Sequence, residues 1–224
     1  MKRIIRKGPN PMKEVNPSET KRAASWELYI DAPMPMVTIM KTFNISRLIK
    51  LKEAGYQLNM LICYCIAKAA YQFEEFYLLP VQRKMMQYDK IGISVIVANK
   101  NGGINSCDIP FEDDFKKFQR AYLENTRLVY ESCTDYEIKD TMMIGTSALI
   151  HFEFDAVMNM YSGIFNNPFL IWGKYREENE KTTLQISFQF HHVQMDGMEA
   201  CAFLTAIQKC MDNIEAFLNK QVDK

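Results

Sequence analysis

The apolar residues of this chain recur with two different spacings along its length. Residues 34–43 (MPMVTIMKTF) and 91–98 (IGISVIVA) are short runs of β-branched and apolar residues, a pattern typical of β-strands. The same reasoning predicts further strands at 143–150, 168–175 and 184–192. In the stretches between them the apolar residues recur every three or four positions, which predicts helices.

Four helices follow from that spacing. One begins at Asn44 or Ser46 and ends at Gly55, and another covers 58–76, where LNMLICYCIAKAA is apolar nearly all round and indicates burial on several sides. A third is predicted over 112–130, with Phe115, Phe118 and Tyr122 on one face. The last carries the stripe Cys201, Leu204, Ile207, Met211, Ile214 and Leu218. We therefore expect an α/β fold, a mixed β-sheet flanked by helices.

Composition favours a single domain without a nucleic-acid or membrane partner. The 224 residues contain no repeat and no Gly/Ser linker, so we expect one domain over 1–224 with a polar segment at 1–19. Lys and Arg total 27, as do Asp and Glu, and no long run of one sign appears. No apolar run reaches the roughly 18 residues of a membrane span. We expect a soluble, cytoplasmic protein.

The six cysteines do not form a metal site in this interpretation. They show no C-x-x-C pair and no histidine at ligand spacing, which is typical of reduced, mostly buried thiols. The chain has only three histidines, His151, His191 and His192, and nothing indicates an exposed, low-pKa thiol beside one of them. We expect neither a metal nor a cysteine nucleophile.

The most informative stretch is LQISFQFHHVQMDG, residues 184–197. Because side chains alternate faces along a strand, His192 extends the apolar row formed by Leu184, Ile186, Phe188 and Phe190. Burial would lower the pKa of this imidazole and leave it neutral, as a general base requires. The same pattern also fits a core histidine bonded to a backbone carbonyl. Likewise Asp196-Gly197, where the glycine permits positive φ, also fits an ordinary turn.

Together, His191, His192, Asp196 and Gly197 resemble the signature of the chloramphenicol acetyltransferase family. Looser forms of this motif occur in 2-oxo-acid dehydrogenase acyltransferases and in peptide-synthetase condensation domains. Four more stretches narrow the resemblance to the first family, and together they extend it over about residues 20–211. They are Arg22 with Trp26-Glu27-Leu28-Tyr29, AAYQFEE at 69–75, Thr146-Ser147-Ala148-Leu149 and Gly173-Lys174-Tyr175.

The resemblance implies a CoA-dependent acyltransferase-like sandwich that transfers acetyl directly from acetyl-CoA to a hydroxyl. In it His192 is the base, and its tautomer is set by its own backbone carbonyl, so Asp196 need not contact the ring. Asp196 instead pairs with Arg22 and supports the architecture of the site. The family is a homotrimer with active sites between subunits, the histidine of one chain facing the serine of its neighbour, which implies the same assembly here.

Two further residues have roles by resemblance only. Ser147 matches the serine that donates to the oxyanion of the tetrahedral intermediate, although a serine in a strand can simply pack there. Tyr29 matches a position that lines the acceptor pocket, and an aromatic residue on an early strand explains it equally well.

Three departures leave the acceptor open. Ile150 follows Leu149 where the family tends to have proline, Ile171 replaces a threonine, and Ala98 to Ile104 (ANKNGGI) replaces a polar stretch. The expected reaction is O-acetylation of chloramphenicol or a related small molecule, and with it antibiotic resistance. The alternatives are an acyltransferase for a different alcohol or amine, or a catalytically silent CoA- or ligand-binding homologue.

Overall fold

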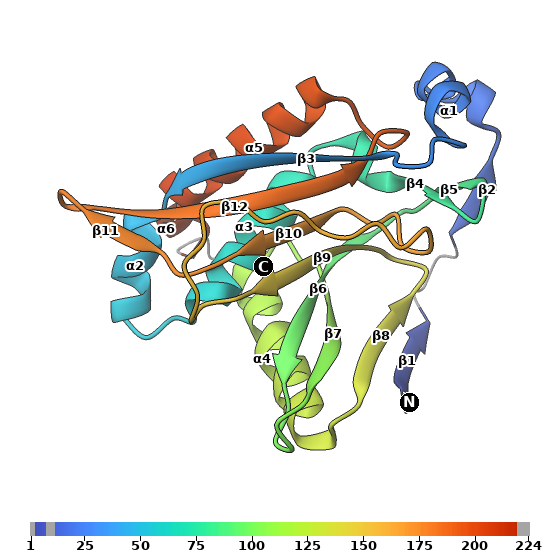
Figure 1. Ribbon diagram of the computed structural model, residues 1–224. Helices are drawn as coiled ribbons and strands as arrows, with labels where there is room; N and C mark the ends of the chain where they lie inside the picture. Colours follow the sequence, from blue (N-terminus) through green and yellow to red (C-terminus); the bar gives the residue numbers. More distant parts are fainter. Residues whose placement is uncertain (1–2, 8–11, 219–224) are drawn as a thin grey trace.

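A computed structural model describes residues 3–7 and 12–218, and its centre is a nine-stranded mixed sheet (Figure 1). The strands run in the order β1-β8-β7-β6-β9-β10-β12-β11, and β3 pairs with the other side of β12. Their bounds are β1 Arg3–Lys7, β3 Met36–Asn44, β6 Ile91–Ala98, β7 Ile104–Pro110, β8 Asp135–Lys139, β9 Met142–Ala148, β10 Phe169–Trp172, β11 Arg176–Glu178 and β12 Lys181–His191.

Parallel and antiparallel pairs mix in this sheet. β9 runs parallel to both β6 and β10, whereas β12 is antiparallel to β3, β10 and β11. The long strand β12 thus joins β3 to the rest of the sheet. Its carboxyl end, where His191 pairs with Met36, carries the predicted catalytic motif.

Helices cover the apolar face of the sheet. Phe188 on β12 packs against Phe203 of α5, with ring centroids 4.9 Å apart, and Phe76 lies 4.6 Å from Phe203. The helix α3 is buried along nearly its whole length, as its all-round apolar sequence predicts. The helices are α1 Ala23–Tyr29, α2 Ser46–Glu53, α3 Leu58–Ala70, α4 Phe115–Ser132, α5 Gly197–Asp212 and α6 Ile214–Leu218.

A three-stranded sheet beside the end of β12 supports the site (Figure 1). It consists of β2 Lys13–Val15, β5 Lys84–Gln87 and β4 Leu78–Val81, and 3₁₀ turns occur at Pro17–Glu19 and Glu74–Tyr77. The side-chain amide of Gln194 donates to the carbonyl of Leu78, and the side-chain amide of Asn166 donates to the carbonyl of Pro80. β4 therefore contacts both the turn after β12 and the segment before β10.

The opposite face of the sheet is crossed by residues 149–168, which form no helix or strand (Figure 1). Gln189, whose side chain points away from the helices, donates to the carbonyl of Asn159 at 3.1 Å and to the hydroxyl of Thr38 at 3.2 Å. Exposed apolar side chains are frequent here: Leu149, Ile150, Phe152, Met158, Met160, Ile164 and Phe165. This segment, called the crossing segment below, thus presents an uncovered apolar surface.

The α/β class and the mixed sheet are as predicted, and the five predicted strands are present, β6 with the predicted ends and the other four with shifted ends. The helix predicted at 58–76 is wrong beyond Ala70, because Phe76 reaches the core from a 3₁₀ turn instead. Cys201 is exposed, since Phe203 rather than Cys201 fills the buried face of α5. Within the polar segment 1–19 the structure forms β1 and β2, while residues 1–2 and 8–11 lie outside the description.

Candidate active site

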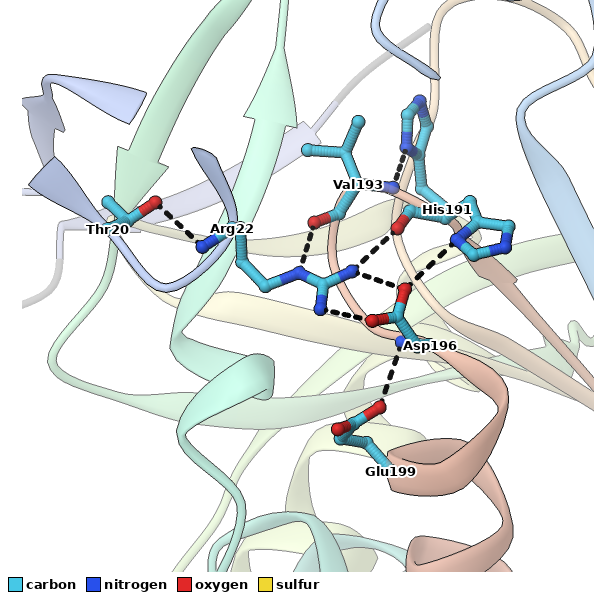
Figure 2. Close-up of polar contacts among 7 residues, drawn as sticks. Thr20, Arg22, His191, Val193, Asp196 and Glu199 are labelled. Carbon is cyan, nitrogen blue, oxygen red and sulfur yellow. Dashed lines mark hydrogen bonds and ion pairs between the residues drawn. The ribbon is translucent and has the colours of Figure 1, made fainter. Parts of the chain in front are cut away.

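The chain makes a tight turn at the end of β12, and this turn presents the two histidines differently. The amide of His192 still donates to Pro35 beside β3, at 2.8 Å, and the amide of Gln194 donates back to the carbonyl of His191 at 2.8 Å. The strand therefore stops at His191, and the alternation of faces stops with it. Asp196 then begins α5 through a capping box with Glu199 (Figure 2).

The predicted pair of Arg22 and Asp196 is present and bidentate (Figure 2). Nη1 and Nη2 of Arg22 lie 2.8 and 2.7 Å from the two carboxylate oxygens. The same guanidinium donates through Nε to the carbonyl of Val193 and through Nη2 to that of His192, both at 2.9 Å. One buried side chain from the start of α1 therefore fixes the turn at three points, and its hydrogen bonds lower the pKa of Asp196.

His192 lies between an aromatic ring and a carboxylate. The ring of Tyr29 stacks on the imidazole with centroids 4.1 Å apart and an interplanar angle of 22°. Nδ1 of His192 lies 3.2 Å from Oδ1 of Asp196, without the alignment of a hydrogen bond. This arrangement directs Nδ1 toward the carboxylate and favours the tautomer with the proton on Nδ1, which leaves Nε2 free to accept a proton.

Two expectations about this histidine are corrected. Nδ1 of His192 makes no hydrogen bond to its own backbone carbonyl, which accepts from Arg22 instead, and it lies against Asp196. His192 is also not buried in the core, because 30% of its side chain stays exposed. The periodicity of the strand does not extend through the turn, so it cannot place this residue.

The buried imidazole is the preceding one. His191 is 1% exposed, and its Nδ1 accepts from the amide of Val193 at 3.1 Å. Burial, with a smaller contribution from the neighbouring His192, lowers the pKa of His191 to about 4. A neutral His191 thus helps hold the turn that presents His192.

Ser147 lies far from His192 within this chain. It pairs with Ile171 on β10, which pairs with Ser187 on β12, two strands from Ser147 and four residues before the strand ends at His191. At about 3.4 Å per residue and about 4.8 Å per strand, Ser147 and His192 are roughly 15–20 Å apart. The chain does not bring these two predicted residues together.

The remaining predicted positions are placed as follows. Tyr29 ends α1 and is not on a strand, so its stacking depends on helix geometry. Gly197 opens α5 with unoccupied space around it and without positive φ, so the expected role of glycine in the turn is wrong. Ile150 is exposed and Ile171 buried, and residues 98–104 connect β6 to β7 through a turn held by the Asn99 side chain.

Sequence reasoning did not identify Gln194 as part of this turn. Its side chain is fully buried, and its amide nitrogen donates to Leu78 of β4 at 2.9 Å. A polar residue between two buried apolar ones, Val193 and Met195, was the available signal. Within residues 3–7 and 12–218 no group of three metal-ligating side chains converges, and no helix has the length and apolar character to cross a membrane.

The architecture is that of the CoA-dependent acyltransferases. A solved chloramphenicol acetyltransferase superimposes with a TM-score of 0.74 at 17% identity, covering 89% of this chain and 99% of that one. A probable dihydrolipoamide acetyltransferase from Listeria monocytogenes gives 0.64 at 17% identity, covering 90% and 95%. These identities establish the fold alone.

The sequence comparison defines the family within this class. The family model for chloramphenicol acetyltransferase matches residues 13–208, and the chain belongs to that family. It is 24% identical over 209 residues to a chloramphenicol acetyltransferase of Clostridium perfringens, covering 89% of this chain and 94% of the relative. It is also 24% identical over 170 residues to chloramphenicol acetyltransferase 2 of Escherichia coli, covering 73% and 79%.

Proposed function

We propose that this protein transfers an acetyl group from acetyl-CoA to the hydroxyl of chloramphenicol or a related small molecule, without an acyl-enzyme intermediate. The observation that carries the proposal is the His192 imidazole, which is stacked by Tyr29 and flanked by the Arg22–Asp196 pair. These contacts leave Nε2 as its free acceptor. A histidine oriented in this way suits proton abstraction from an alcohol.

His192 begins the proposed reaction as general base. Nε2 takes the hydroxyl proton as the acceptor oxygen attacks the thioester carbonyl carbon, and the C–O bond forms while the carbonyl electrons move onto oxygen. When the intermediate collapses, the C–S bond breaks and the imidazolium returns the proton to the CoA thiolate. Asp196, held by Arg22, lies where it can stabilise the imidazolium as it forms.

Ser147 is the proposed donor to the oxyanion. Such a donor must lie within about 3 Å of the developing charge, whereas Ser147 and His192 of one chain are roughly 15–20 Å apart. The two residues can serve one site only if they come from different chains. We therefore propose the homotrimer of the family, with each site made by His192 of one chain and Ser147 of the next.

The crossing segment supports this assembly. Its exposed apolar side chains begin directly after β9, the strand of Ser147, and the segment lies on the sheet face opposite the described helices (Figure 1). An apolar surface of this kind is typically buried against a partner. In the proposed trimer the neighbouring chain covers the surface and contributes its half-exposed His192 there.

A different acceptor is the second candidate, and one observation favours it. Ile171 is buried in register with Ser147, on the face of the sheet where the acceptor would bind. An apolar side chain there, where the family has threonine by resemblance, changes the surface offered to the acceptor. A related alcohol or an amine, transferred by the same histidine, would fit this change.

The test is thiol release from acetyl-CoA, with chloramphenicol as acceptor and His192→Ala as the variant. We expect the variant to lose about 10²- to 10⁴-fold in kcat, because it lacks the base. Arg47→Gln, which breaks the exposed ion pair of Arg47 with Glu215 between α2 and α6, away from the turn after β12 and from the crossing segment, should keep the wild-type rate and serves as the control. Equal loss in both variants, or an unchanged rate in His192→Ala, would refute the assignment. No release by wild type with chloramphenicol would direct the search to other alcohols and amines.

A further inference from the structure

Arg176 is placed to anchor the crossing segment by charge. It begins β11, where its main chain pairs with Thr183 of β12. Its Nε lies 2.7 Å from Oε1 of Glu153, and its Nη2 lies 2.6 Å from Oδ1 of Asp155. One planar guanidinium, 39% exposed, therefore links two carboxylates of the segment to the central sheet.

The main chain of the segment docks at the same place. The amide of Leu149 donates to the carbonyl of Trp172, and the amide of Lys174 donates to that of Phe152, both at 2.8 Å. A Cβ at Gly173 would lie 2.6 Å from the Phe152 carbonyl oxygen and 2.8 Å from the Phe154 ring. Residues 149–155 thus lie as close to the end of β10 as a glycine allows.

The charges around this contact give the arginine its role. Four carboxylates, those of Glu153, Asp155, Glu177 and Glu178, line an open hollow of about 780 Å³ together with Lys174, Tyr175 and Arg176. Without Arg176, Glu153 and Asp155 would face the two glutamates of β11 with Lys174 as the remaining cation of the lining. Repulsion among them would favour release of residues 149–155 from the sheet.

We propose that Arg176 is a positioning residue for acetyl transfer, which holds residues 149–155 against the end of β10 and so fixes the crossing segment that follows Ser147. The catalytic role of the segment rests on the function proposed above, whereas its anchoring does not. His192 and Ser147 lie outside this contact, so its loss affects the placement of the acceptor more than the chemistry.

The anchoring is tested by hydrogen–deuterium exchange in Arg176→Gln. We expect about fivefold faster exchange at the Lys174 amide and in residues 149–156, because both ion pairs that close this contact are lost. The matched control is Arg47→Gln, which breaks the exposed pair of Arg47 with Glu215, 3.0 Å apart on α2 and α6. Equal exchange in the two variants at these positions would overturn the anchoring, whether or not an acceptor has been found.

The positioning role is tested by kinetics on the same variants. Arg176→Gln should raise KM for the acceptor about three- to tenfold and change kcat less than twofold, and wild-type KM should rise toward that value between about 0.05 and 0.5 M salt. Faster exchange with unchanged KM would overturn the positioning role and leave the proposed function intact. Absence of acetyl transfer by wild type with every acceptor would instead refute the proposed function, and with it any role of Arg176 in that reaction.

Discussion

The ring of Tyr29 lies face to face with the imidazole of His192, with 4.1 Å between the ring centroids. The two residues are far apart in sequence and come from different parts of the fold, the end of α1 and the turn after β12. The stack limits rotation of the imidazole about its side-chain bonds. Asp196 meets the Nδ1 edge of the ring, so the two neighbours together fix its direction.

Removal of this stack should slow catalysis without abolishing it. Tyr29→Ala should lower kcat/KM about three- to tenfold, because a ring pair contributes roughly 0.5–1.5 kcal/mol. Tyr29→Phe, which keeps the ring, should retain most of the rate. Steady-state kinetics with acetyl-CoA and a saturable acceptor measures this effect.

The control for Tyr29 is its neighbour on the same helix. Leu28 is exposed, so Leu28→Ala should behave as wild type. If Tyr29→Phe loses as much activity as Tyr29→Ala, the hydroxyl and not the stack carries the effect. That outcome would support contact of Tyr29 with the acceptor, the role given by resemblance.

The arginine that holds the turn should contribute measurably to stability. Arg22→Gln should lower the free energy of unfolding by about 2 kcal/mol, since it removes charged hydrogen bonds to Asp196 and to two backbone carbonyls. This is less than the roughly 3–5 kcal/mol for a fully buried pair, because 46% of the Asp196 side chain is exposed and can be hydrated. Urea unfolding at neutral pH measures the difference.

The pH dependence of the free energy of unfolding shows whether Asp196 is the partner through which Arg22 stabilises the fold. Arg22 lowers the pKa of Asp196, so the stabilisation is present above the ordinary carboxyl pKa of about 4 and is lost as the pH falls through the lowered value. The difference in free energy of unfolding between wild type and Arg22→Gln should therefore become smaller at acidic pH. Arg83→Gln, which breaks an exposed pair with Asp31, should cost little at any pH. If this difference does not become smaller in acid, the stabilisation comes from the contacts of Arg22 with the two backbone carbonyls alone.

His191 should make the protein less stable as the pH falls from about 6.5 to about 4. Its folded pKa is lowered to about 4, whereas the unfolded chain takes up a proton near pH 6.5, so protonation favours unfolding within that window. The stabilisation is complete above pH 6.5, and about 3 kcal/mol is lost by the time the pH passes the folded pKa. Unfolding in urea at several pH values measures this slope.

His191→Gln offers the comparison, because its side-chain oxygen can still accept from the Val193 amide but does not titrate. The free energy of unfolding of this variant should depend on pH less steeply than that of wild type, by up to about 1.4 kcal/mol per pH unit in that window. Other titrating groups are common to both proteins and cancel in the comparison. Identical slopes would show that folding does not lower the pKa of His191.

The sequence predicts the fold class and the strands well, because apolar runs such as 91–98 and 184–190 are long enough to show their period. It predicts the end of β12 poorly. The turn after His191 breaks the alternation, so the strand pattern assigns to His192 the burial that belongs to His191. The stack of Tyr29 and the link from Gln194 to Leu78 join segments far apart in sequence, which no local pattern records.

The resemblance supplied what periodicity could not, the pairing of Arg22 with Asp196, and the structure confirms it. It did not indicate that the same arginine would bind the carbonyls of His192 and Val193. It also implied that Ser147 and His192 of one site come from different chains, and the strand register adds that the two residues lie apart within one chain.

That separation gives the last prediction, which concerns mixed assemblies of two inactive variants. Ser147→Ala alone should lower kcat about 10²- to 10³-fold, the loss typical of an oxyanion donor, and His192→Ala should lose the base. In trimers reassembled from equal amounts of both, a site is intact when it takes His192 from a Ser147→Ala chain and Ser147 from a His192→Ala chain. For random assembly this holds for about one quarter of the sites, so about a quarter of wild-type activity should return.

The control is a mixture of Ser147→Ala with the double variant His192→Ala/Ser147→Ala, in which no site is complete. Recovery in the first mixture and none in the control would place His192 and Ser147 of one site on different chains. If neither mixture recovers although co-purification of differently tagged chains shows mixed trimers, the two residues do not share a site across subunits. The single-chain distance of roughly 15–20 Å would then exclude Ser147 as the oxyanion donor, and the donor would have to be sought nearer to the end of β12.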